Sequence, residues 1–127
     1  MTAVLPNLIE RLSSEERKKY PVKSGVFDYF RDALFRLARV SYDGNEKHNK
    51  GEPLHWSRGK SADHEDCAAR HLLAYAPQDQ DDAVEEHLAN LAWRSLAELQ
   101  LFLEKKYSIV LPPRASNAHT AEALPSE

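Results

Sequence analysis

The chain has 127 residues, of which 42% are hydrophobic, and its 17 basic and 20 acidic side chains give a formal net charge of −3. This length suits a single domain, and no run reaches the roughly 18 apolar residues needed to cross a bilayer, so we expect no membrane-spanning segment. The slightly acidic balance offers no general attraction for nucleic acid, and we expect no direct nucleic-acid binding. Because Cys67 is the only cysteine and residues 1–11 lack the features of a secretory signal, we expect a cytoplasmic protein.

The first half of the chain is predicted to form two helices. Ser13 or Ser14 is expected to cap a short helix that ends near Lys19. A second helix is predicted from about Val26 to Tyr42, because apolar residues recur there at three- and four-residue steps. Its apolar stripe consists of Phe27, Phe30, Leu34, Leu37, Ala38 and Ser41. The sequence Asp43-Gly44-Asn45 then supplies turn chemistry, which predicts that this helix ends before it.

The second half begins with a polar loop and continues as two further helices. Residues 47–60 contain two glycines and a proline and are expected to form the loop. Ser61 is the expected N-cap of a helix over residues 62–76, which Pro77 closes. The longest apolar periodicity follows and predicts a helix that ends near Lys105-Lys106, cations that suit a helix C-terminus. Its predicted apolar face consists of Val84, Leu88, Leu91, Ala92, Ser95, Leu96, Leu99, Phe102 and Leu103.

Together these elements predict an all-α fold, a compact bundle of three to five helices. Residues 1–111 are expected to form this single helical domain. The strand-like run Ser108 to Leu111 is too short to build a sheet. Residues 112–127 are rich in alanine and small polar residues, and we predict that they form a disordered tail.

Histidines and acids are concentrated in the second half of the predicted bundle. Five of the six histidines lie between residues 48 and 87. Histidine is the side chain most used for proton transfer and metal ligation near neutral pH, so this concentration favours a polar reaction centre. Helical spacing pairs Asp63 with Asp66 on one predicted helix and Asp82 with Glu85 on the next. Carboxylates paired in this way on facing helices suit magnesium or manganese holding a polyphosphate.

Each of these residues also has an ordinary structural explanation. Acids in the first turn of a helix stabilise its N-terminus. His71 and His87 flank apolar stripes, where they would be hydrogen-bonded interior histidines or would join an acid around a softer metal. Trp56 is more typical of a packing group than of a base-stacking platform. Structural zinc is disfavoured, since His64, Cys67 and His71 lack the second half of a four-ligand pattern.

Several short motifs occur in the order of a known family. They are Ala38-Arg39-Val40-Ser41-Tyr42-Asp43-Gly44, Lys47-His48, Trp56, Arg70-His71-Leu72, the acids around Asp82, His87-Leu88-Ala89 and Ala92-Trp93. In order and spacing, over about residues 26–105, this set resembles a phage-associated family of dATP/dGTP diphosphohydrolases. More distantly, it is similar to the all-helical nucleotide pyrophosphohydrolases. The resemblance would allow only a local break at Asp43-Gly44-Asn45.

Two positions depart from the family pattern. The run before the closing motif leaves open which of Asp79, Asp81 and Asp82 is the important acid. Asn90 stands where the family often has a histidine, and asparagine is a poorer metal ligand that can still hydrogen-bond a substrate.

The resemblance implies a metal-dependent enzyme that hydrolyses purine nucleoside or deoxynucleoside triphosphates and releases pyrophosphate, in the cytoplasm of a bacterial host if a phage encodes it. In this interpretation, Asp66, Asp82 and Glu86 hold one or two Mg²⁺ or Mn²⁺ ions, and His71 and His87 are the catalytic residues that orient water or the ligands. The implied substrate-binding residues are Lys47 and Arg70 on the phosphates, Trp56 on the purine, and His48 and Asn90.

Two other functions stay open at this point. The chain could be a non-catalytic phage or prophage interaction module whose acids bind a basic host surface. It could also be a histidine-and-aspartate metal phosphohydrolase with another phosphoester substrate. A homo-oligomer is a further expectation, because a helical protomer this small can leave one side of its site open.

Overall fold

The computed structural model describes residues 8–60 and 62–109, and this part of the chain is all-α. Its elements are α1 (Leu8–Arg11), α2 (Ser14–Arg17), the π-helix η1 (Lys23–Phe27), α3 (Arg31–His48), the 3₁₀-helix η2 (Arg58–Lys60), α4 (His64–Tyr75) and α5 (Asp81–Tyr107). The predicted fold class is confirmed. Among the described helices, none has the length and apolar character that would let it cross a membrane.

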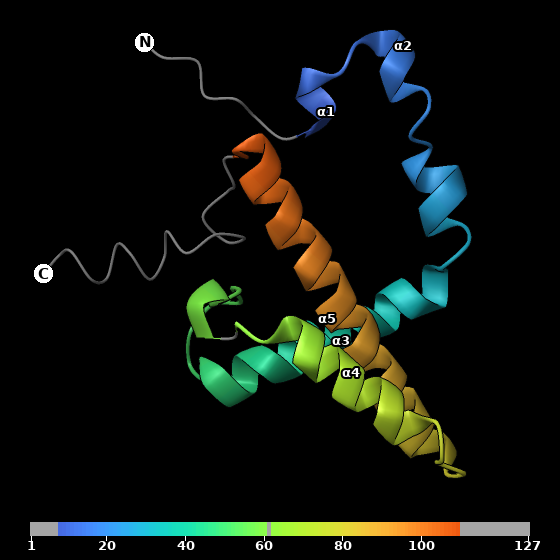
Figure 1. Ribbon diagram of the computed structural model, residues 1–127, viewed down its shortest axis with the longest axis vertical. Coiled ribbons are helices and arrows are strands. Elements are labelled where there is room, and N and C mark those ends of the chain that lie inside the picture. The colour runs from blue at the N-terminus through green and yellow to red at the C-terminus, as the bar shows by residue number, and fades with distance from the viewer. Residues whose placement is uncertain (1–7, 61, 110–127) are drawn as a thin grey trace, which may run out of the picture.

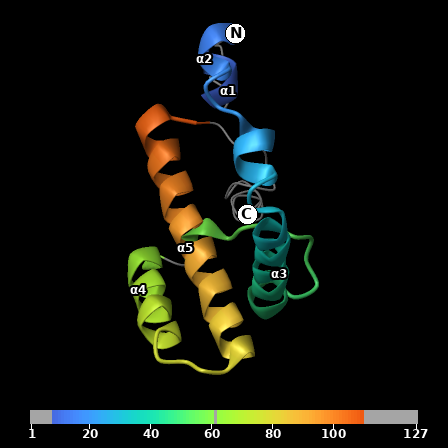
Figure 2. The ribbon, with the colours of Figure 1, turned by 90° about the vertical axis from the view of Figure 1, so that its right-hand side faces the viewer.

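Helix α5 is the axis of the arrangement. It spans 27 residues and forms an antiparallel hairpin with α4, while α3 packs against it from another direction (Figure 1). Viewed from the side, α4 and α3 lie on opposite sides of α5 (Figure 2). The N-terminal segments α1, α2 and η1 extend away from this three-helix unit, and Arg11 returns to donate a hydrogen bond to the Ser108 carbonyl at 3.3 Å.

The short N-terminal helix begins as its sequence predicts. The Ser13 hydroxyl accepts a hydrogen bond from the Glu16 amide at 3.1 Å, which satisfies one of the unpaired donors of the first turn. The helix ends at Arg17, two residues before the predicted end at Lys19.

Helix α3 corrects the prediction at both ends. It begins at Arg31 rather than near Val26, and it runs through Asp43-Gly44-Asn45 to His48 rather than ending before that triplet. At the C-terminal end the reason lies in contacts of Asn45 with the loop that follows, because its side chain is buried and donates to the Glu52 carbonyl at 3.1 Å. Fixing this amide outweighs the roughly 1 kcal/mol that a glycine costs inside a helix. The predicted loop is shortened accordingly, and residues 58–60 add a 3₁₀ turn to it.

The last two helices follow their predicted positions closely. Helix α4 starts two residues late, with Asp63 at the N-cap position, and the predicted cap Ser61 lies outside the described residues. Helix α5 ends after Lys105-Lys106, where Ser108 adopts a left-handed conformation with φ of 50°. Ile109 is not in a strand, and the remainder of the strand-like run and the predicted tail 112–127 lie outside the described part.

The interior of the three-helix unit is small and polar. Among the described residues the buried apolar side chains are Ala89 and Ala97, whereas Asn45, Asn49 and His64 are buried polar groups. Large apolar side chains such as Phe35, Leu73 and Phe102 are exposed by 84%, 74% and 61%. Within residues 8–60 and 62–109, large side chains of the apolar stripes that the periodicity identifies are therefore left exposed.

Candidate active site

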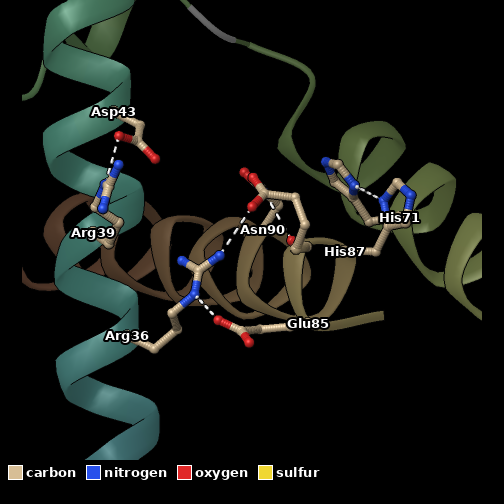
Figure 3. Close-up of polar contacts among 8 residues, drawn as sticks. Arg36, Arg39, Asp43, His71, Glu85, His87 and Asn90 are labelled. Atoms are coloured by element: carbon tan, nitrogen blue, oxygen red, sulfur yellow. Dashed lines mark hydrogen bonds and ion pairs between the residues drawn. The ribbon is translucent and has the colours of Figure 1, made fainter. Parts of the chain in front are cut away.

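Two histidines link α4 and α5 near the middle of their hairpin. The Nδ1 atoms of His71 and His87 lie 3.0 Å apart, and Figure 3 shows the rings facing one another. Because a neutral imidazole donates from one nitrogen and accepts at the other, one ring donates Nδ1–H to the lone pair of its partner. Burial lowers the pKa of His71, and the neighbouring His87 lowers it further. The lowered pKa favours the neutral form of the His71 imidazole, the form that a general base needs.

Two carboxylates of α5 bind an arginine of α3. Arg36 reaches from α3 and forms ion pairs with Glu85 and, at 2.9 Å, with Glu86, the residue next to His87. Asn90 donates from its side chain to Glu86 at 3.0 Å. Figure 3 shows two groups of contacts: Arg36 of α3 with Glu85 and the Asn90 region of α5, and the pair of His71 and His87 between α4 and α5. This set of side chains, His71, His87, Glu86, Asn90 and Arg36, is called the three-helix cluster below.

Arg36 is the most confined charged group of this cluster. Its side chain is 26% exposed, and the Nη1 atom is buried without a hydrogen-bond partner among the described residues. An unpaired buried donor costs free energy unless an acceptor occupies the position. On the same helix, Arg39 instead binds Asp43 one turn away at 2.8 Å.

A second polar cluster lies around the two tryptophans. The ring of Trp93 meets that of Trp56 edge-on at 5.3 Å, and its indole N–H donates to the Ser41 hydroxyl at 3.1 Å. Arg94 lies 2.9 Å from Nδ1 of His64, a side chain that is 2% exposed. Since a guanidinium only donates, His64 accepts at Nδ1 and carries its proton on Nε2. Burial and the Arg94 charge both lower the pKa of His64.

Contacts of Arg58 and of the Asn49 side chain hold the loop after α3 next to this tryptophan cluster. The guanidinium of Arg58 lies 4.0 Å from the centre of the Trp56 ring and forms an ion pair with Glu104 of α5 at 2.6 Å. The Asn49 side chain accepts from the Ser57 hydroxyl at 3.1 Å. These contacts hold Trp56 as a packing group of the loop, so its predicted purine stacking has no support from this geometry.

The other residues predicted from the sequence lie outside the three-helix cluster's hydrogen bonds. Lys47 and His48 are exposed in the last turn of α3. Arg70, exposed on α4 beside His71, contacts Asp63 at 3.3 Å and the Cys67 sulfur at 3.0 Å. The hydrogen bond from Arg70 holds the pKa of Asp63 below its ordinary value.

The predicted metal ligands are not assembled as a cage within one chain. Asp66 and Asp82 are exposed on α4 and in the first turn of α5, whereas Glu86 is engaged by Arg36 and Asn90. Over residues 8–60 and 62–109, no group of three or more histidine, cysteine, aspartate or glutamate side chains has the geometry to hold a metal ion. The metal assignment stays a prediction.

Several residues of both clusters escaped the sequence analysis. Arg36 sits between apolar positions of its helix, and its partners are 49 and 50 residues away, so no local pattern marks it. Asn45 and Asn49 did carry a signal: two asparagines one helical turn apart, which here hydrogen-bond each other at 3.2 Å.

A family model described as dATP/dGTP diphosphohydrolase, N-terminal, matches residues 12–108, which include every helix from α2 to α5. The chain belongs to this family. The resemblance drawn from the motifs is thereby confirmed, and both clusters lie inside the matched region of the diphosphohydrolase family. No curated protein sequence and no solved structure matches the chain.

Proposed function

We propose that the chain hydrolyses purine deoxynucleoside triphosphates to the monophosphate and pyrophosphate. Its membership of the dATP/dGTP diphosphohydrolase family over residues 12–108 carries this proposal. The three-helix cluster supports it, because it provides an imidazole pair, a carboxylate and a guanidinium on three helices that pack together.

The histidine pair supplies the base. A water oxygen attacks the α-phosphorus, the bond from that phosphorus to the bridging oxygen breaks, and pyrophosphate leaves. The water's proton passes to an imidazole of the His71–His87 pair, whose low pKa at His71 keeps a lone pair available near neutral pH. Asn90 donates to Glu86 and so fixes the position of this carboxylate.

Cationic side chains stabilise the charge that develops on the phosphates. Arg36 holds a buried donor without a partner beside the glutamates, and such a donor suits a phosphoryl oxygen. Arg70 and Lys47 are exposed and would contact the more distal phosphates. His48 and Asn90 complete the proposed substrate-binding set, and Trp56 is left out of it because Arg58 packs on its ring.

We further propose that the reaction depends on Mg²⁺ or Mn²⁺. A polyphosphate carries charge that a divalent ion neutralises, and magnesium commonly binds through one or two carboxylates together with substrate phosphates. Since the described residues form no three-ligand cage, Asp66, Asp82 and Glu86 are proposed as separate contributors and no chemical step is assigned to the ion.

The test is direct incubation of the purified chain with dATP, dGTP, dCTP and dTTP in the presence of magnesium or manganese. Release of pyrophosphate and the monophosphate from dATP and dGTP is the expected result, with loss of activity in excess chelator. Release of inorganic phosphate or triphosphate would instead indicate another phosphohydrolase. Intact nucleotides, from protein that is folded and supplied with metal, would contradict the proposal.

A further inference from the structure

Helix α5 carries a row of exposed residues with heptad spacing. The row consists of Asp81, Glu85, Leu88, Ala92, Ser95, Leu99, Phe102 and Lys106, separated by alternating steps of four and three residues. All eight residues are exposed, although Glu85 also forms an ion pair with Arg36 of α3, so α3 and α4 flank the stripe without covering it. A sustained four-three pattern is the signature of a helix that packs lengthwise against another helix. We call this row the α5 seam.

Two hollows border the α5 seam. The first, of about 400 Å³, lies between α3 and α5 and is lined largely by apolar groups, among them Ala33, Leu37, Val84 and Leu88. The second, of about 510 Å³, lies between α4 and α5 and includes Leu99 and Phe102. The seam with its flanks is thus a hollowed apolar face, whereas folded monomers seldom expose large continuous apolar patches.

We propose that this face binds the same face of a second copy of the chain, with the two α5 helices antiparallel. The centre of the seam reads large, small, small, large: Leu88, Ala92, Ser95, Leu99. This order is the same in both directions, so an antiparallel pair places Leu88 against the partner's Leu99 and Ala92 against the partner's Ser95. The small central residues let the helices approach closely, and the leucines close the seam on either side.

The ends of the seam are complementary in the same register. Phe102 falls opposite Glu85 of the second copy, where the first hollow is open to receive an aromatic ring. Lys106 falls opposite Asp81, so the basic last turn of each α5 lies on the acidic first turn of the other. A parallel pair would bring acid onto acid and leave the hollow unfilled. Shape and charge therefore select a second copy in one orientation.

We expect a second copy of the chain to cover this face, because the face needs a partner whenever the chain is folded. Only Ala89 and Ala97 are buried apolar residues among those described, while Leu88, Leu99 and Phe102 are exposed by 41%, 53% and 61%. A chain with so little enclosed apolar surface requires a partner whenever it is folded, and another copy is always present at matched concentration. The inference stands apart from the proposed function, since it uses no residue of the histidine pair.

Cysteine pairing tests both the interface and its orientation. In a Cys67→Ser background, Leu88→Cys and Leu99→Cys chains are prepared singly and also refolded as a mixture, followed by mild oxidation. We expect a disulfide-linked dimer in the mixture and none from either variant alone. Self-linked dimers of each single variant would mean a parallel pair, and absence of any cross-link, with a sedimentation mass that stays at 14.5 kDa, would overturn the proposal.

Charge reversal provides a test that leaves the seam's apolar layers intact. Asp81→Lys or Lys106→Glu alone should weaken dimerisation by about tenfold, and the double variant should restore it, because the opposite charges again face each other. Ser95→Glu, which puts carboxylates into the centre of the seam, should give the monomer by sedimentation. Ser24→Glu, on exposed η1, is the matched control and should stay dimeric. Failure of the double variant to recover would contradict the register.

Discussion

His71 of α4 and His87 of α5 face each other through their Nδ1 atoms at 3.0 Å. One proton occupies the contact, because two protonated rings would direct N–H against N–H across it. The contact joins α4 to α5, and burial lowers the pKa of His71, which favours the neutral form of that ring.

Replacement of His71 by asparagine tests this pair as the base of the proposed reaction. Asparagine retains a hydrogen-bonding side chain but cannot accept a proton, so kcat for dATP and dGTP should fall by about 10²–10⁴. KM should change much less, because the base acts on water rather than on substrate binding. Steady-state pyrophosphate release measures both constants.

His119→Asn is the matched control for that experiment. It makes the same chemical change outside the family match at residues 12–108, and activity should be unchanged. Full activity of folded His71→Asn protein would remove the pair from the mechanism.

Acid should destabilise the fold through two histidines. Burial lowers the pKa of His64 and of His71 below the ordinary value of 6.5. As pH falls through 6.5, these histidines therefore bind protons in the unfolded chain before they do so in the folded chain, and the free energy of unfolding decreases. Well above pH 6.5, these two histidines are neutral in both the folded and the unfolded chain, so their full contribution to the free energy of unfolding is present. Urea unfolding between about pH 8 and about pH 5 measures the decrease.

His64→Gln separates this effect from the titration of carboxylates. Glutamine lacks the titrating group, so the variant should be less stable at neutral pH but show a shallower loss between pH 7 and about pH 5.5. An equal slope in the variant and the parent chain would exclude His64 as a cause.

The sequence predicted the positions of the helices better than it predicted the contacts that their residues make. Periodicity and the Lys105-Lys106 pair placed the end of α5 within two residues, because both are local properties of a helix. The end of α3 was missed, since it depends on a hydrogen bond from Asn45 to the Glu52 carbonyl that no local pattern reveals. Similarly, His71 was singled out as a candidate, but its meeting with His87 requires the α4–α5 hairpin.

For the apolar stripes, too, the sequence predicts which residues share a face but not what that face packs against. The predicted face of α5 included Leu88, Leu99 and Phe102 as residues that would pack, yet they are exposed in the single chain. Periodicity predicts that a helix has an apolar face, but it does not predict whether the surface that covers this face belongs to the same chain. For Trp56 the sequence left packing and stacking open, and the guanidinium of Arg58 on its ring supports packing.

Arg36 and Arg39 offer a matched comparison one helical turn apart. Arg36→Met removes the ion pairs with Glu85 and Glu86, frees the carboxylate beside His87, and loosens α3 from α5. Because Glu86 belongs to the proposed site, kcat/KM should fall by about 10–100-fold. Arg39→Met removes an ion pair with Asp43 on the same helix and should leave kcat/KM within about twofold of the parent. Equal effects of the two variants would mean that Arg36 acts through general stability alone.

The ion pair between Arg58 and Glu104 is predicted to be the most costly single contact to break. The two side chains are 7% and 14% exposed and lie 2.6 Å apart, so water does not screen them as it does a surface pair. Glu104→Gln removes the carboxylate that faces the buried guanidinium of Arg58 and should lower the free energy of unfolding by about 3–5 kcal/mol in urea titrations. Glu15→Gln, which breaks an exposed pair with Lys18, should change it by less than about 0.5 kcal/mol. Replacing both partners, as Arg58→Met with Glu104→Leu, removes both buried charges and should recover much of the loss. A double variant less stable than Glu104→Gln would show that Arg58 supports the loop through its contact with the Trp56 ring rather than through its charge.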